Sequence, residues 1–177
     1  EVAEALFVEI VKALQLSGDE VVLDAYCGIG TFTLPLAKQV KQAIGWEVQA
    51  AAVEQANTNA KLNGLTNIAF YADKVETSLS QLLETDESKI AQSPSFSGEI
   101  DIVLLDPPRS GCDRAVIEAL LQLKPQRIVY VSCKPATLAR DLKLLCQEGG
   151  YHLTRVQPAD FFPQTAHVEC AAFLSLK

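Results

Sequence analysis

The chain has 177 residues, of which 49% are hydrophobic and 21% charged, a balance typical of one compact domain that excludes disorder over most of its length. No apolar run approaches the roughly 20 residues of a membrane-spanning helix, and no leader peptide is recognised at the start, so a cytoplasmic protein is expected. The net charge of −7 argues against a free-standing nucleic-acid binder, because affinity for phosphates comes mainly from lysine and arginine.

The distribution of charge and the cysteine pattern indicate where a polyanion could bind and which kinds of site are not expected. Residues 1–99 carry 6 basic and 14 acidic side chains, whereas residues 100–177 carry 9 basic and 8 acidic ones, so a polyanion is expected to meet the second half with help from a partner or another domain. The five cysteines are odd in number and include no Cys-x-x-Cys pair. Reduced thiols are therefore expected, with no disulfide scaffold and no metal site.

Apolar residues at three- and four-residue spacing predict an amphipathic helix over 2–14, and residues 21–25 read as a buried strand that ends in a glycine turn. Strand-like and helix-like segments then alternate, which is typical of a parallel sheet with helices on both faces. The expected strands are 43–46, 67–71, 101–105 and 126–131, and the expected helices are 31–40, 48–62, 113–122 and 135–147.

The end of the chain departs from this alternation. Segments 151–157 and 167–176 follow one another without a helix, with a proline-containing turn over 160–164, so they should pair as an antiparallel hairpin at one edge. Residues 85–99 are polar and serine-rich, as in a surface loop. The sequence thus predicts a single α/β domain over 1–177, with a Rossmann-like sheet of seven mostly parallel strands.

Ligands of open parallel sheets sit at the carboxyl ends of the strands. The first strand ends in DAYCGIGT (24–31), where Gly28 and Gly30 let the backbone approach a ligand and Thr31 can start the next helix. A tight strand-to-helix connection without a ligand is the alternative. A dinucleotide fold would prefer a third glycine at position 33, which is Thr33 here.

Acidic residues follow the next strands. Glu47 can accept both ribose hydroxyls of a nucleoside, in a nicotinamide enzyme as well as in other nucleoside sites, and Asp73 could read an adenine edge or simply be solvated. Two prolines after Asp106 restrict the backbone and hold this acid at the crevice, where it serves chemistry or caps the proline turn.

Two further positions carry the candidate chemistry. Cys133 ends a central strand just before a helix with proline in its first turn, and both the helix terminus and Lys134 favour the nucleophilic thiolate; an inert buried thiol is the alternative. Glu169 lies within an apolar strand, where desolvation would raise its pKa toward that of a proton acceptor, unless it faces solvent on an edge strand.

Four ordered motifs make the chain resemble the RNA uracil-5-methyltransferase family, namely DAYCGIGTFTLPLA (24–37), LLDPPRSGC (104–112), IVYVSCKPATLARDL (128–142) and FFPQTAHVE (161–169). The resemblance implies a class I S-adenosylmethionine-dependent catalytic domain that methylates C5 of a uridine in RNA, with rRNA expected before tRNA. It assigns Cys133 as nucleophile and Glu169 as base, with Asp106 and Arg109 orienting the uracil. It places the cofactor at Tyr26, Gly28, Gly30, Thr31, Glu47 and Asp106, with Asp73 or Lys74 on the adenine side.

The resemblance has two departures. Lys134 stands where the family usually has asparagine, and the upstream RNA-binding domains of the family, with a glutamine contact to the cofactor, are not in this chain. A monomer is the default expectation. The rival functions are an amino-group methyltransferase, disfavoured by Arg109 and Cys133, a nicotinamide enzyme, disfavoured by Thr33, and a module that only binds a nucleoside or a protein.

Overall fold

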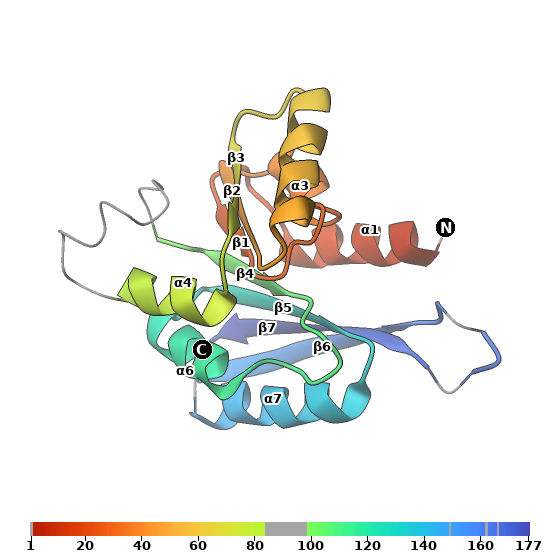
Figure 1. The fold of residues 1–177 in the computed structure, drawn as a ribbon. Coiled ribbons are helices and arrows are strands. Elements are labelled where there is room, and N and C mark those ends of the chain that lie inside the picture. The colour runs from red at the N-terminus through yellow and green to blue at the C-terminus, as the bar shows by residue number, and fades with distance from the viewer. Residues whose placement is uncertain (1, 84–98, 149, 162, 166) are drawn as a thin grey trace.

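The computed structural model describes the chain except for residues 1, 84–98, 149, 162 and 166, so the expected loop over 85–99 falls almost entirely outside the described residues. A seven-stranded sheet runs through the molecule in the order β3-β2-β1-β4-β5-β7-β6 (Figure 1). The strands are β1 (Val21–Asp24), β2 (Gln42–Glu47), β3 (Ile68–Ala72), β4 (Ile102–Leu105), β5 (Arg127–Ser132), β6 (Tyr151–Ala159) and β7 (Glu169–Leu176).

The first five strands are parallel, and β7 pairs antiparallel with both β5 and β6. This confirms the predicted seven-stranded sheet and its antiparallel last hairpin, with β6 as the edge strand. The chain leaves β1 toward β2 and β3 on one side and returns to β4 and β5 on the other. The crossover direction therefore reverses beside β1, and that reversal opens a crevice at the carboxyl ends of β1 and β4.

Helices cover both faces of the sheet (Figure 1). One face carries α4 (Val75–Leu83), α6 (Arg114–Leu123) and α7 (Pro135–Glu148), and the other carries α1 (Val2–Leu14), α2 (Thr33–Ala37) and α3 (Ala50–Leu62). None of the described helices is both long and apolar enough to cross a membrane.

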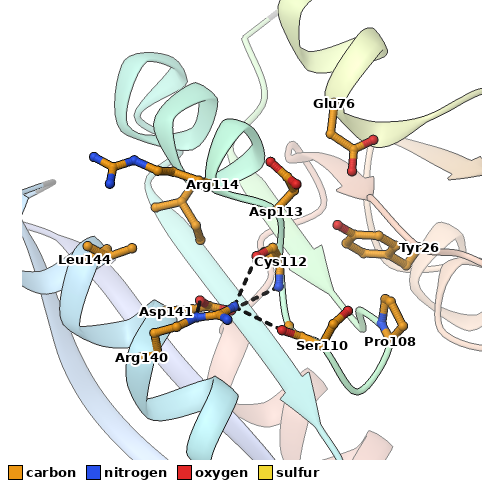
Figure 2. Close-up of a pocket in the computed structure, with 12 residues that line it drawn as sticks. Tyr26, Glu76, Pro108, Ser110, Cys112, Asp113, Arg114, Arg140, Asp141 and Leu144 are labelled. Atoms are coloured by element: carbon orange, nitrogen blue, oxygen red, sulfur yellow. Dashed lines mark hydrogen bonds and ion pairs between the residues drawn. The ribbon is translucent and has the colours of Figure 1, made fainter.

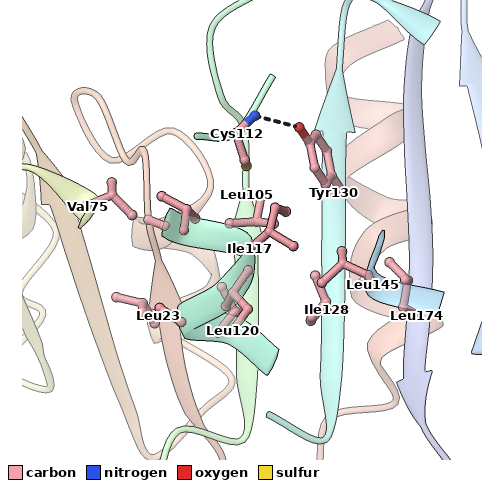
Figure 3. Close-up of a cluster of buried hydrophobic side chains, with 14 of the residues drawn as sticks. Leu23, Val75, Leu105, Cys112, Ile117, Leu120, Ile128, Tyr130, Leu145 and Leu174 are labelled. Carbon is pink, nitrogen blue, oxygen red and sulfur yellow. Dashed lines mark hydrogen bonds between the residues drawn. The ribbon is translucent and has the colours of Figure 1, made fainter. Parts of the chain in front are cut away.

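The central strands are buried on both sides, which explains why they read as continuous apolar runs. In β4, Val103 and Leu105 face the core under α4, α6 and α7, whereas Ile102 and Leu104 face the core under α1 and α2. Figure 3 shows the first of these cores, where Leu105 and Ile117 pack between the sheet and α6. Burial of this kind contributes about 25 cal/mol per Å² of apolar surface and fixes the sheet on which the site is built.

Two expectations about helices were wrong. Helix α4 was not predicted, although the parallel connection from β3 to β4 needs a crossover. Its inward face includes Ser78 between Val75 and Leu79, and this buried polar residue interrupts the apolar pattern. Helix α2 is shorter than expected: it begins at Thr33, so Thr31 does not start it, and Phe32 at the N-cap makes no side-chain capping bond.

Candidate active site

The carboxylate of Glu47, at the end of β2, holds the glycine turn between β1 and α2 by a hydrogen bond. Glu47 Oε2 accepts the backbone N–H of Gly28 at 3.2 Å, and Glu47 Oε1 accepts that of Gln49 at 2.9 Å. Gly28 and Gly30 have φ angles of +53° and +89°, a region that favours glycine. A Cβ at Gly28 would meet nothing within 4 Å, so the backbone here lies open to a ligand.

A cavity of about 320 Å³ lies beside this turn, at the carboxyl ends of β1, β2 and β3. It brings together four of the predicted cofactor residues, Tyr26, Glu47, Asp73 and Lys74. The other residues that line it were not expected from the sequence: Ala25, Val48, Val75 and Glu76. Val48 follows Glu47 directly and is 61% exposed, so it offers an apolar surface beside a carboxylate.

Asp73 also organises the start of α4. Its carboxylate accepts the backbone N–H of Lys74 at 2.7 Å and the hydroxyl of Ser78 at 3.0 Å. Both Asp73 and Lys74 line the cavity, so the structure keeps both as candidates for the adenine side. Because Asp73 is held by two bonds to α4, its remaining lone pairs have a fixed direction.

Asp24 is a buried acid of the site that was not selected from the sequence. Its side chain is 1% exposed, its Oδ2 accepts the hydroxyl of Thr33 at 2.6 Å, and its Oδ1 has no partner among the described residues. Burial, opposed by the Thr33 bond, raises the pKa of Asp24 to about 7. Thr33, whose presence argued against a dinucleotide fold, thus holds the acid at the end of β1.

Replacing Asp24 by asparagine should change how stability depends on pH. The pKa of Asp24 rises from 3.8 to about 7 on folding, so between these values the folded chain holds a proton that the unfolded chain has released. Stability from this group is therefore present below about pH 4 and lost as the pH rises toward 7. Between pH 5 and pH 8 the free energy of unfolding of the variant should therefore rise by about 2 kcal/mol relative to that of wild type. Urea unfolding at the two pH values measures this change. Exposed Asp19→Asn is the control, and an equal effect at both pH values would contradict the assignment.

Cys133 and Glu169 lie at neighbouring strand ends. The last antiparallel pair between β5 and β7 is Ser132 with Cys170, so Cys133 follows β5 directly, in the bend that leads to α7, and Glu169 is the first residue of β7. Both side chains are partly exposed. The turn after β5 is held by Ser132, whose hydroxyl accepts the N–H of Lys134 at 3.1 Å, and α7 begins at Pro135 as expected.

A second cavity, of about 420 Å³, brings Glu169 together with Asp106 and Thr31. The acids lie near each other at its wall. Loss of hydration and the Glu169 charge raise the pKa of Asp106 to about 6, although its side chain is exposed to the cavity. Burial raises the pKa of Glu169 as well, and the nearby Arg109 guanidinium opposes that rise. Glu169 is therefore partly buried and partly desolvated, and its role as a base stays a prediction.

The rest of this cavity is largely apolar and was not anticipated from the sequence. Its remaining lining residues are Ala3, Glu4, Leu6, Phe7, Phe32, Pro35, Val131 and Phe161. Phe7 and Phe32 contact each other with ring centroids 6.2 Å apart. Phe161 belongs to a motif that was recognised, but its position in the cavity depends on the hairpin bringing it back beside α1.

Known proteins and one family model match this chain over nearly its whole length. A family model described as tRNA (Uracil-5-)-methyltransferase matches residues 1–177. An uncharacterized RNA methyltransferase of Nostoc sp. is 58% identical over 176 residues, which are 99% of this chain and 35% of that protein. One of Synechocystis sp. is 49% identical over 97% of this chain and 34% of that protein. The chain thus spans about a third of the length of these relatives.

Solved structures share the fold. Pyrococcus abyssi tRNA (uracil-54, C5)-methyltransferase in complex with S-adenosyl-L-homocysteine superposes with a TM-score of 0.72 at 31% identity, over 96% of this chain and 38% of that one. N-methyltransferase NodS of Bradyrhizobium japonicum superposes with a TM-score of 0.71 at 16% identity and supports the fold alone. The Rossmann-like methyltransferase fold class expected from the sequence is confirmed.

Proposed function

The chain belongs to the tRNA (uracil-5-)-methyltransferase family, and we propose that it is a catalytic domain that transfers a methyl group from S-adenosylmethionine to C5 of a uridine in RNA. The observation that carries the proposal is that β5 ends one residue before Cys133, while the neighbouring strand β7 begins at Glu169, which lines one cavity together with Asp106. The proposed nucleophile, proton acceptor and orienting acid would therefore act at one end of the sheet.

The cofactor would occupy the cavity beside the glycine turn. Glu47 would accept the ribose hydroxyls with the lone pairs left by its two backbone bonds, and Asp73 or Lys74 would face the adenine. Tyr26 and Val48 would contact its apolar surfaces. The open backbone at Gly28 and the unpartnered Oδ1 of buried Asp24 fit a polar ligand along the carboxyl end of β1. Gly30, Thr31 and Asp106 would complete the site toward the second cavity.

Cys133 and the acids that line the second cavity would carry out the substitution. Uracil C5 is a weak nucleophile, so the Cys133 thiolate would first add to C6, and the C5–C6 π electrons would move to an enolate at C4. C5 would then use the enolate electrons to take up the methyl group that bound S-adenosylmethionine supplies, which restores the C4 carbonyl and leaves S-adenosylhomocysteine. Glu169 would then remove the C5 proton, and the electrons of that C–H bond would restore the double bond and expel the Cys133 thiolate.

Asp106 and Arg109 would orient the base during these steps. The target uridine must be flipped out or single-stranded to reach a cavity at the strand ends. The apolar walls formed by Phe7, Phe32 and Phe161 suit a flat heterocycle. The acid and the guanidinium could then bind its polar edge.

The substrate is expected to be RNA bound with help from regions outside this chain. The acidic charge of residues 1–99 disfavours a phosphate backbone there, and relatives are about three times longer. We therefore propose residues 1–177 as a single catalytic domain of a longer protein. The preference for rRNA over tRNA stays a prediction, and both RNAs are test substrates.

The cofactor assignment is tested by calorimetric titration of the full-length protein with S-adenosylhomocysteine and, separately, with NAD. We expect binding of S-adenosylhomocysteine alone. Glu47→Gln should weaken it about 10- to 100-fold, because a charged acceptor of ribose hydroxyls is lost. Glu54→Gln, at an exposed position on α3, is the matched control. NAD binding, or an unchanged affinity in Glu47→Gln, would overturn the assignment.

A further inference from the structure

The segment that carries Asp106 and Arg109 is fastened to α7, the helix that begins just after Cys133. The Thr137 hydroxyl has the Lys134 carbonyl as its nearer acceptor at 3.0 Å and also contacts the carbonyl of Arg109 at 3.4 Å. Arg140, one turn further along, donates from Nη2 to the carbonyls of Ser110 at 3.1 Å and Cys112 at 3.2 Å (Figure 2). The first turns of α7 therefore connect the segment that carries Asp106 and Arg109 with the residue proposed as nucleophile, Cys133.

Asp141 completes this attachment from the buried side of α7. Its side chain is 1% exposed, and its carboxylate accepts three hydrogen bonds, from Cys112 N–H at 3.0 Å, the Tyr130 hydroxyl at 2.6 Å and Arg140 Nε at 2.8 Å. Burial first, and then the neighbouring Cys112 and Asp141, raise the pKa of Tyr130, so its hydroxyl stays a donor. A carboxylate satisfied in this way has one orientation.

The backbone of the segment lies directly against these side chains at Gly111. This residue has a φ of +81°, and a Cβ on it would come within 2.6 Å of both Arg140 Nη2 and Asp141 Oδ2. The segment and α7 are thus in contact without an intervening side chain. A small change at the contact would shift the segment as a whole, because two prolines and a turn bond from Gly111 N–H to the Pro108 carbonyl stiffen it.

We propose that Arg140 and Asp141 are positioning residues that fix the Asp106–Cys112 segment relative to Cys133, and hence set the placement of the uracil against the nucleophile; this inference rests on the proposed function. The Arg140 side chain is 53% exposed and fills no space in the core, so its bonds to the two carbonyls serve placement. Displacement of a substrate-orienting group by about 1 Å costs a rate factor of up to about 100.

The test compares Arg140→Ala with Arg114→Ala in the full-length protein. Arg140 and Arg114 both line a third cavity, of about 570 Å³ (Figure 2). Arg114 is 75% exposed and forms its ion pair with Glu118 on its own helix, so it is a matched control. Two quantities are measured, the rate of covalent adduct formation with 5-fluorouridine RNA in the presence of S-adenosylmethionine, and the affinity for S-adenosylhomocysteine. Arg140→Ala should form the adduct at least about 10-fold more slowly with cofactor affinity within about 2-fold of wild type. Arg114→Ala should match wild type in both.

Further variants separate placement from folding. Arg140→Lys keeps a cationic donor group and should recover part of the rate. Asp141→Asn should slow adduct formation, and its thermal midpoint is measured to confirm that it folds. An Arg140→Ala rate equal to wild type would overturn the inference, as would a parallel loss of cofactor affinity and rate, which indicates a merely structural role. Absence of an adduct in wild type would instead overturn the proposed function.

Discussion

Replacing Cys133 by alanine is expected to reduce covalent complex formation with 5-fluorouridine RNA to background and to abolish methyl transfer. The fluorine at C5 leaves Glu169 no proton to remove, so a protein that attacks C6 stays attached to the RNA. Cys133 is the thiol that directly follows β5, next to the strand that begins at Glu169, and α7 begins two residues later. Denaturing gel electrophoresis of the full-length protein with labelled RNA and S-adenosylmethionine measures the complex.

Cys146 provides the matched control for this experiment. It is another partly buried thiol, but it lies near the C-terminal end of α7, whereas Cys133 lies just before the first residue of that helix. Cys146→Ala should form the complex at the wild-type rate. A complex that persists in Cys133→Ala would show that another group attacks the base, and the covalent mechanism would have to be abandoned.

Glu169→Gln is expected to separate methylation from release. The amide cannot take up the C5 proton, so turnover should fall by about 10²- to 10⁴-fold, the usual contribution of a positioned base. Because addition and methylation precede this step, ordinary uridine RNA should now accumulate as a methylated covalent complex. Methyl transfer from labelled S-adenosylmethionine, followed on a denaturing gel, measures both quantities.

Two controls distinguish this outcome from damage to the site. The double variant Cys133→Ala with Glu169→Gln should form no complex, because the nucleophile is missing. Glu148→Gln, at an exposed position ending α7, should turn over normally. If Glu169→Gln turned over at the wild-type rate, Glu169 would not be the base. If the variant were slow but trapped no RNA, Glu169 would act before the covalent step.

Lys134 follows Cys133, the proposed nucleophile, directly in the chain. Its side chain is exposed, and its backbone N–H and carbonyl both bond to the hydroxyl of Ser132, at 3.1 Å and 3.3 Å. The turn around Cys133 is therefore shaped by Ser132 and the backbone of Lys134. The Lys134 side chain is left to face the solvent beside the thiol.

The architecture and most of the strand-end residues can be read from local sequence patterns. Central strands such as Ile102–Leu105 are buried on both faces, so they appear as apolar runs, and the polar residues that end them must lie at one edge of a parallel sheet. The same reasoning identifies Glu47, Asp73 and Asp106 from the amino-acid sequence alone. Helix α4 escapes it because its buried face includes Ser78, whose partner Asp73 lies five residues away.

Which of these residues meet depends on the folded chain. Cys133 and Glu169 are far apart in the sequence, and the pairing of β5 with β7, which sets their strand ends side by side, depends on packing across the whole sheet. The same holds for Thr33 with Asp24 and for Arg140 with the carbonyls of Ser110 and Cys112. A hydrogen-bonding side chain leaves no periodic signal in sequence, since its partner is chosen by the three-dimensional approach of two elements. The residue types of the site are therefore visible in the sequence, whereas their distances and orientations come from the fold.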